Sequence, residues 1–493
     1  MHFDLPEQMR NQLERAANRV KAARRPLAIS HIDTDGITAL AIVCRMFRRL
    51  KKSPLWRNIH QLNSETIRDV RKLVSEKRPD TVIFSDLGTG QMPLIIEALG
   101  KQESLESIIV LDHHLPQNNT EGYLQKHANS PIIEVNPCHH GISGSSDLSG
   151  AGTAFLLAYE VSGKNADLSE LAVVGATGDL QRYYGKGFSG VNRQILETGV
   201  ESGMVRLDRD LTFFGINTRP LPFLLEYATD PYIPGITGNR DASFEFFEAL
   251  GIPMKVNERW RRWVDLNTQE KQVVIQHLMS LILQSYQDAR KAQGIVGDVI
   301  TLLNRPERSE LRSAKEFSTL LNACGRNRRA KVGVKICLGN QEAYQEGRTL
   351  LREHRRNLAT ALRRIETHGF DEREGMYLVQ DSEIQDTIIG IVIGMAQSSR
   401  ILPDDKPVIG VTTNTSEKSS LAKLSGRTCR RLVNRGINLK ETFVHCGECL
   451  NTKYDALVVE AGGHPMAAGA FIQPNRLEEY LDLVSRNLSK KLV

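Results

Sequence analysis

The sequence predicts a two-lobed α/β protein, with a parallel sheet in the first lobe and a smaller α/β domain at the C-terminal end. Its 493 residues are too many for one hydrophobic core, so two or three domains are expected. Roughly the first 200 residues alternate short apolar runs with amphipathic segments, which is the pattern of βαβ units. A charged helical pattern from Gln341 to His368 precedes a second alternating region, and we expect it to link the lobes.

Three β-rich apolar runs are expected to form the parallel sheet of the first lobe. They are Pro26–Ser30, Thr81–Ser85 and Ser107–Leu111. The amphipathic segments Thr38–Leu50 and Met92–Leu99 are expected to be helices on the faces of that sheet. The apolar run Leu171–Ala176 fits either a strand or a buried helix, because periodicity does not separate the two in a short run.

The second half of the chain is expected to hold a helical insertion and then the second α/β unit. Residues Ser243 to Gln293 are mostly helical in pattern. In the last unit we expect three strands and two helices: strands Met376–Gln380, Pro407–Thr412 and Ser419–Leu424, and helices Thr387–Ser398 and Arg476–Leu488. The predicted boundaries are 1–210 for the first lobe, 211–340 for the insertion and the rest of that lobe, 341–370 for the linker helix and 371–493 for the C-terminal domain.

The composition is that of a soluble globular protein, with 40% hydrophobic and 25% charged residues. The longest strongly apolar run, Thr387 to Ala396, is about half as long as a membrane-spanning helix. The segment Met1 to Arg25 is amphipathic and lacks the continuous apolar stretch of a secretory signal. We therefore expect a cytoplasmic protein.

The seven cysteines are scattered and odd in number, which argues against a disulfide framework. Cys446 and Cys449 form a single CxxC beside His445, but no second pair of ligands lies nearby in the sequence. A structural zinc site usually needs four ligands. We therefore interpret these two cysteines as free thiols in a loop.

The net charge of +6 is only mildly basic, but the basic residues are clustered. The clusters are Arg48–Lys52, Arg326–Lys331, Arg352–Arg356 and Arg427–Arg435. They are compatible with a polyanionic partner, although a solvated helix face explains any single cluster equally well.

Acidic side chains follow each of the three predicted strands. Asp33 and Asp35 come after the first strand, Asp86 after the second and Asp112 after the third. Ligands bind at the carboxyl ends of parallel strands, so these groups should meet in one cleft. Three histidines lie beside these acids in the sequence: His31, His113 and His114. A further acid, Asp179, follows Gly178.

A cluster of at least four carboxylates needs compensating charge, because like charges at close range repel or take up protons. Mixed Asp and His ligation suits Mn²⁺, Fe²⁺, Zn²⁺ or Mg²⁺, and a shared carboxylate could build a two-metal hydrolytic site. Each element alone has another explanation: a lone Asp is often a helix N-cap and a lone His a structural residue. Asp33 to Gly36 could also be a turn, but it is no EF-hand, since Cys44 stands where the twelfth-position Glu belongs.

Five motifs, in order, resemble those of the DHH phosphoesterase superfamily. They are SHIDTDG at Ser30–Gly36, FSDLG at Phe84–Gly88, LDHH at Leu111–His114, GATGD at Gly175–Asp179 and GGHPMAAG at Gly462–Gly469. Three further stretches are similar to the RecJ-like branch: Asn136–Pro137, Leu148–Phe155 and Leu321–Arg326. The resemblance covers nearly the whole chain and implies an N-terminal DHH catalytic domain with a parallel sheet, a helical insertion, a linker helix and a DHH-associated, substrate-binding C-terminal domain.

The resemblance also implies roles for individual residues. It makes Asp33, Asp35, Asp86, His113 and Asp179 ligands of two divalent ions, with Mn²⁺ preferred over Mg²⁺, Asp86 as the bridge and His31 as an extra ligand. Asp112 would orient the site, and His114 would contact the phosphate or hold the DHH turn. Nucleic-acid contacts would come from Arg326, Lys423, Ser425, Arg427, Gly462, Gly463 and His464.

The function that the resemblance implies is a single-strand exonuclease acting on DNA, RNA or both, in DNA replication and repair. The insertion looks like that of archaeal RecJ-like proteins, which are related to a subunit of the eukaryotic CMG helicase and associate with GINS. Bacterial RecJ enzymes usually continue into an OB-fold, whereas this chain ends soon after Ala470–Phe471, which weakens the expectation of long single-strand tracking. Two alternatives are a replisome scaffold and a short-oligonucleotide phosphatase.

Overall fold

The computed structural model describes residues 3–116, 131–181, 187–228, 232–399, 401–413 and 421–492. The chain forms two compact units, Met1–Leu351 and Arg352–Val493. The expected α/β class, with a parallel sheet in the first unit and a second α/β unit after it, is confirmed. Among the helices described, none combines the length and the apolar character that crossing a membrane requires.

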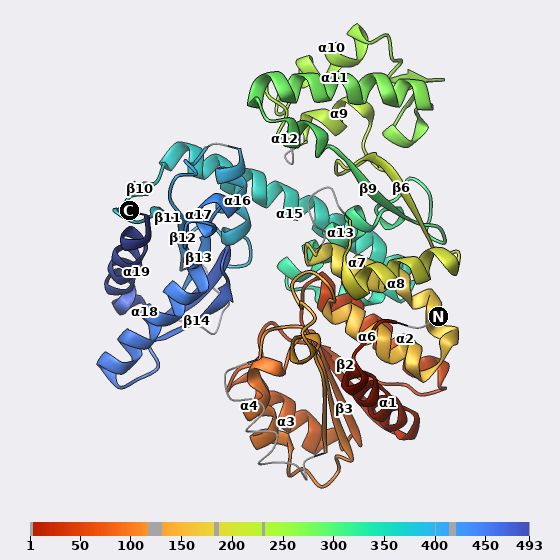
Figure 1. Ribbon diagram of the computed structural model, residues 1–493, viewed down its shortest axis with the longest axis vertical. Coiled ribbons are helices and arrows are strands. Elements are labelled where there is room, and N and C mark those ends of the chain that lie inside the picture. The colour runs from red at the N-terminus through yellow and green to blue at the C-terminus, as the bar shows by residue number, and fades with distance from the viewer. Residues whose placement is uncertain are drawn as a thin grey trace. The chain divides into compact units, whose positions relative to one another are not determined.

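The first unit is built on a five-stranded parallel sheet with the order β2-β1-β3-β4-β5. In Figure 1, β2 and β3 mark this sheet. Strands β1 (Pro26–Ser30), β3 (Thr81–Ser85) and β4 (Ser107–Leu111) lie at the predicted residues and are buried along their whole length. Strands β2 (Leu55–Asn58) and β5 (Ile132–Val135) were not predicted. Strand β2 is exposed or half-buried, so its short, mixed sequence carries no apolar pattern.

Helices cover both faces of this sheet because successive side chains of a strand point to opposite sides. On one face Ala28, Ile83 and Ile109 join the largest core, formed with helices α1 (Glu7–Ala22), α2 (Thr34–Arg49), α6 (Gly150–Val161) and α7 (Ser169–Gly178). On the other, a second core packs against α3 (Thr66–Lys77) and α4 (Met92–Leu99). The apolar run at 171–176 lies in α7, so it is a buried helix.

The insertion leaves this lobe through a two-stranded antiparallel ribbon, β6 (Val205–Leu211) and β9 (Val296–Leu302) (Figure 1). Between them lie α9 (Leu221–Glu226), α10 (Arg240–Ala249), the small hairpin β7–β8 (Lys255–Val256 and Arg259–Trp260), α11 (Thr268–Tyr286) and α12 (Ala289–Gln293). The insertion has its own hydrophobic core, which includes the buried Trp263. Apart from the short hairpin, its elements are helical, as the sequence pattern predicted. Helices α8 (Gly190–Glu201), α13 (Ala314–Arg326) and α14 (Ala330–Cys337) belong to the main lobe.

Helix α15 (Gln341–His368) coincides with the predicted linker, and the boundary between the two units falls within it. The second unit has a six-stranded sheet with the order β10-β11-β12-β13-β15-β14. Its strands are β10 (Asp371–Glu372), β11 (Tyr377–Gln380), β12 (Val408–Thr412), β13 (Ala422–Arg427), β14 (Val459–His464) and β15 (Ala467–Ile472). Its helices are α16 (Ile389–Ser398), α17 (Arg430–Val433), α18 (Leu439–Tyr454) and α19 (Leu477–Leu492).

Two predictions for the second unit were wrong in detail. The third strand, expected over 419–424, runs from Ala422 to Arg427, and positions 419 and 420 lie outside the described residues. Cys446 and Cys449 lie in helix α18 instead of a loop, with Cys446 buried and Cys449 exposed. The helix forms because the segment's apolar side chains, including Cys446, pack against the sheet.

Candidate metal centre

The loop between β1 and α2 supplies the first two carboxylates. Asp33 is the N-cap of α2, where its Oδ1 accepts a hydrogen bond from the Gly36 amide at 3.0 Å. Asp35 lies in the first turn of the helix and is 1% exposed. A Cβ at Gly36 would come within 2.6 Å of the His31 carbonyl oxygen, so only glycine permits this tight entry into the helix.

A second helix N-terminus holds Asp35. The backbone amides of Gly150 and Ala151, at the start of α6, donate to its two carboxylate oxygens at 2.6 and 3.1 Å. Free amides at a helix N-terminus stabilise negative charge. A Cβ at Gly150 would lie 2.8 Å from the Asp86 Cβ and 3.0 Å from Asp35 Oδ2, so glycine is needed for α6 to approach both acids.

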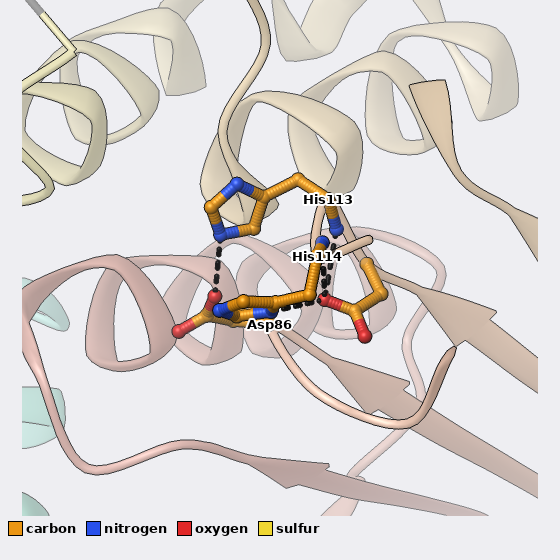
Figure 2. Close-up of side chains that lie close together, drawn as sticks. Asp86, His113 and His114 are labelled. Carbon is orange, nitrogen blue, oxygen red and sulfur yellow. Dashed lines mark hydrogen bonds and ion pairs between the residues drawn. The ribbon is translucent and has the colours of Figure 1, made fainter. Parts of the chain in front are cut away.

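Asp86 follows β3 and lies between the other groups. Its backbone has φ of 58°, an uncommon conformation for a residue other than glycine. Its Oδ1 lies 3.1 Å from His113 Nε2, and Figure 2 shows the two side chains joined by a dashed line. Its Oδ2 is buried, makes no hydrogen bond to any described residue and faces His31 Nδ1 at 3.5 Å. A buried carboxylate oxygen without a hydrogen bond fits a cation ligand.

His113 is held so that one ring nitrogen faces the acids. Its Nδ1 lies 2.5 Å from the carbonyl oxygen of Gly144. Because a carbonyl only accepts, Nδ1 carries a proton, and in the neutral ring Nε2 is left as the acceptor. That Nε2 lies 3.7 Å from Asp35 Oδ2 and 3.9 Å from Asp179 Oδ2. In its neutral form, His113 therefore presents a lone pair among three carboxylates.

Asp112 and His114 hold the turn after β4. Asp112 accepts hydrogen bonds from the backbone amides of Thr89 and His113 at 2.9 and 2.8 Å, and from the ring of His114 at 2.8 Å. Burial would raise the pKa of Asp112, but the imidazoles of His114 and His113 and these hydrogen bonds lower it. The geometry fits the orienting role expected for Asp112 and, for His114, holding the turn.

The charges of the cluster are unbalanced without a cation. Burial raises the pKa of Asp35, and the charges of Asp86 and Asp179 raise it further. Burial also raises the pKa of Asp179, although His113 opposes this. Burial alone would lower the pKa of His113, but Asp86 and Asp179 raise it well above its usual value. Without a cation, these groups therefore tend to hold protons, and a divalent cation would compensate the carboxylate charges better than the protons do.

Two further groups at the cluster shift each other's pKa in opposite directions. Burial would lower the pKa of His31, but the carboxylates of Asp33 and Asp86 raise it well above its usual value. Burial would raise the pKa of Asp33, but His31, whose Nδ1 lies 2.9 Å away, lowers it strongly.

Within the described part of the chain, the ligand atoms of the six predicted metal-binding residues, together with those of Asp112 and His114, fall into three overlapping groups. The groups are His31, Asp33 and Asp86; Asp35, His113 and Asp179; and Asp86, Asp112, His113 and His114, each with ligand atoms within 4.8 Å of one another. Asp86 belongs to two of the groups. Carboxylate oxygens with imidazole nitrogens are a donor set that fits divalent metals such as Mn²⁺ or Mg²⁺.

Apart from Gly463, the predicted nucleic-acid residues of the second unit share one face of its sheet. Gly463 aligns with Ala468 of β15 and Gly426 of β13, so it belongs to the opposite face. Lys423, Ser425 and Arg427 alternate along β13, and the pairing register aligns Ser425 with Gly469 of β15 and Gly462 of β14. The same register brings Arg427 into line with His464 across β15. We call the face that these residues share the glycine face. Arg326, by contrast, ends helix α13 in the first unit.

Several residues that shape the metal centre escaped the sequence analysis. Asn322 Oδ1 accepts from the Thr34 amide at 3.2 Å, and a Cβ at Gly325 would come within 2.2 Å of the Ile32 carbonyl oxygen. The stretch Leu321–Arg326 therefore seats α13 on the first motif, a role that its sequence did not indicate. Gln181, two residues after Asp179, also contacts the cluster.

Comparison with protein families agrees with this geometry. The model of the DHH family N-terminal domain matches residues 27–178, and that of the DHH-CID domain matches residues 213–296. An uncharacterized protein of Methanocaldococcus jannaschii is 29% identical over 470 residues, which are 94% of this chain and 93% of that protein. A DHH domain with such a cluster supports hydrolase chemistry of the phosphoesterase or nuclease type.

Solved structures show the fold of both lobes. RecJ of Thermus thermophilus in complex with Mn²⁺ has a TM-score of 0.57 at 17% identity; the match covers 97% of this chain and 55% of RecJ, so this chain spans about half that enzyme's length. CDC45 of Entamoeba histolytica has a TM-score of 0.59 at 13% identity, over 98% of both chains. Residues 27–178 therefore match the DHH family and residues 213–296 match the DHH-CID domain, and the chain has the fold of the RecJ and CDC45 structures.

Proposed function

We propose that this protein is a metal-dependent exonuclease that removes mononucleotides from single-stranded DNA, RNA or both, in DNA replication or repair. The observation that carries the proposal is the convergence of Asp33, Asp35, Asp86, His113 and Asp179, with the Oδ2 of Asp86 buried and lacking a hydrogen bond. These five side chains, with His31, would hold two divalent ions, which we expect to be Mn²⁺. When bound, the ions would supply Lewis-acid activation of water and of the scissile phosphate.

The protein's own residues position the cluster. The α6 amides fix both oxygens of Asp35, and the Gly144 carbonyl fixes the ring of His113. Asp112 holds the DHH turn by accepting from the Thr89 amide. Because these groups are already held in place, they would stabilise the charge that develops on the phosphate without having to move.

The glycine face is proposed to bind the sugar–phosphate backbone. Lys423 and Arg427 supply cations, and the guanidinium suits phosphate oxygens. Gly462 has no atom within 4 Å of where a Cβ would lie, so the strand surface is open there to a ligand's backbone. His464 is exposed at the end of the same strand.

The test is Mn²⁺-dependent digestion of single-stranded DNA and RNA oligomers labelled separately at each end. Mononucleotide released from one labelled end by the native protein, and absent with Asp35→Ala, is the expected result, and it gives the polarity as well. Asp208→Ala, an exposed acid that pairs with Arg206 outside the cluster, is the matched control and should remain active. Equal activity of Asp35→Ala and the native protein would reject the site.

A second candidate function is a scaffold in the replisome, with GINS and the replicative helicase as partners. The similarity to CDC45 over 98% of both chains favours it, whereas the complete set of five ligand positions favours an active nuclease. Absence of cleavage of every oligomer, short ones included, by protein shown to bind Mn²⁺ would favour the scaffold. Turnover restricted to dinucleotides would instead indicate a short-oligonucleotide phosphodiesterase. Association of purified GINS with the chain at low salt tests the partnership directly.

A further inference from the structure

Two buried side-chain amides connect the N-terminus of α6 with the metal centre. The Ser149 amide donates to Asn192 Oδ1 at 3.3 Å, and Asn192 Nδ2 donates to Gln181 Oε1 at 2.6 Å. Gln181 Nε2 in turn donates to Asp179 Oδ2 at 2.7 Å and to the Gly144 carbonyl oxygen at 2.8 Å. Gln181 is 2% exposed and Asn192 is 3% exposed.

The direction of this chain of hydrogen bonds is fixed by its first donor. A backbone N–H can only donate, so the Asn192 oxygen must face Ser149 and its NH₂ group must face Gln181. The Gln181 oxygen is then used as an acceptor, and its NH₂ group is left for Asp179 and the Gly144 carbonyl. Neither amide can rotate by half a turn without placing two oxygens, or two NH₂ groups, against each other.

The chain of hydrogen bonds ends on two groups that matter for metal binding. Gln181 holds one oxygen of Asp179 directly. It also shares the Gly144 carbonyl oxygen with His113 Nδ1, the contact that sets which ring nitrogen of His113 faces the acids. The same helix terminus binds Asp35 through the next two amides, so α6 supports three ligand positions.

We propose that Gln181 and Asn192 are positioning residues of the metal centre: Gln181 orients the Asp179 carboxylate and the His113 ring, and Asn192 orients Gln181. The proposal rests on the metal-dependent function proposed above, but not on the substrate. Neither side chain would touch the metal or the nucleic acid. Because Asn192 reaches Asp179 and His113 only through Gln181, the two residues should behave as a single unit toward these two ligands.

The test measures Mn²⁺ affinity of the full-length protein by titration, with free Mn²⁺ followed by electron paramagnetic resonance. The variants are Gln181→Met, Asn192→Leu and the double variant, which keep the side-chain volume and remove the hydrogen bonds. The matched control is Asn165→Leu, another buried asparagine of this lobe, whose Nδ2 donates to the Ala158 carbonyl oxygen. Thermal unfolding of each variant reports whether the fold is retained.

Each single variant should bind Mn²⁺ about tenfold more weakly, the size of effect typical for residues that orient ligands, while the control binds as the native protein does. The double variant should lose no more than Gln181→Met alone. Native affinity in Gln181→Met, an equal loss in Asn165→Leu or a multiplied loss in the double variant would each overturn the proposal. If the native protein binds Mn²⁺ and Asp35→Ala does not, the metal centre stands whatever the result for Gln181; if the native protein binds none, both proposals fall.

Discussion

The metal centre and the glycine face differ in how completely the protein fixes them. Asp35, Asp86 and His113 are at most 6% exposed, and Asp35 and His113 each have at least two partners that fix their orientation. On the glycine face, His464 is exposed, and Gly462 has no atom within 4 Å of the position that a Cβ would take. The buried, held centre of the cluster suits chemistry, and the open part of the glycine face, around Gly462 and His464, suits binding of a polymer of variable sequence. Substitutions in the metal centre should therefore abolish catalysis, whereas substitutions on the glycine face should weaken nucleic-acid binding.

The largest effect is expected for Asp86→Asn, which keeps the shape of the side chain and removes a charge from the group shared by two ligand clusters. We expect nuclease activity to fall by about a thousandfold or more, as is common when a central catalytic group is removed. Rates with a labelled single-stranded oligomer, at Mn²⁺ concentrations up to saturation, measure it. Activity within about tenfold of the native rate would show that Asp86 is not central.

A matched pair of glycine substitutions compares the two regions directly. In Gly150→Ala the new methyl would lie 2.8 Å from the Asp86 Cβ, so α6 or Asp86 must shift; in Gly462→Ala the methyl meets no atom within 4 Å. A displacement of this kind at a preorganised site costs roughly a hundredfold in rate, whereas Gly462→Ala should keep its kcat and change at most the KM. Steady-state kinetics separate the two, and an equal loss of kcat in both variants would contradict the contrast.

The fold was predictable where burial is uniform. Strands β1, β3 and β4 are fully buried, and β3 and β4 are rich in β-branched residues, so their sequences alone located them, and the acids that follow them were found for the same reason. Strand β5 is just as buried over most of its length but only four residues long. Too short a segment gives no period to detect.

The supporting residues of the site could not be predicted because they act across long separations. Asn322 contacts the Thr34 amide from 288 positions away, and Gln181 contacts the Gly144 carbonyl oxygen from 37 positions away. A single polar residue in a helix has no periodic signal, and only the fold shows which backbone donor it faces. In the motif Leu321–Arg326 the terminal arginine was the predicted functional residue, while the structure shows Asn322 and Gly325 in contact with the metal-binding loop.

The pH dependence of Mn²⁺ binding should arise from groups of the metal centre and not from the glycine face. The pKa values of Asp35, Asp179, His31 and His113 are all raised in the metal-free protein, so these groups keep their protons to higher pH, and a metal must displace them. Mn²⁺ affinity should therefore rise with pH and go on rising above about 6.5, where an ordinary imidazole has lost half its protons. Calorimetry in buffers of different ionisation enthalpy measures the protons released. A Mn²⁺ affinity that does not change between about pH 6 and pH 8 would contradict this prediction.

The smallest effect is expected on the glycine face, from Lys423→Gln. The Lys423 ammonium lies 4.0 Å from the centre of the Phe471 ring, which pairs with it across β13 and β15. Loss of one phosphate contact should weaken single-strand binding a few-fold and lower the slope of log affinity against log salt by about 0.7. Mn²⁺ affinity should be unchanged, because Lys423 is not among the groups that could hold a metal.

Fluorescence anisotropy of a labelled single-stranded oligomer over a range of salt concentrations measures this slope. Lys453→Gln is the control: this lysine lies on α18, outside the glycine face, and pairs with Glu479 at the surface. If both variants lowered the slope equally, binding would depend on overall charge and not on the glycine face. If Lys423→Gln lowered Mn²⁺ affinity instead, the separation between a region for chemistry and a region for binding would be wrong, since a charge on the second unit would then be acting on the metal centre of the first.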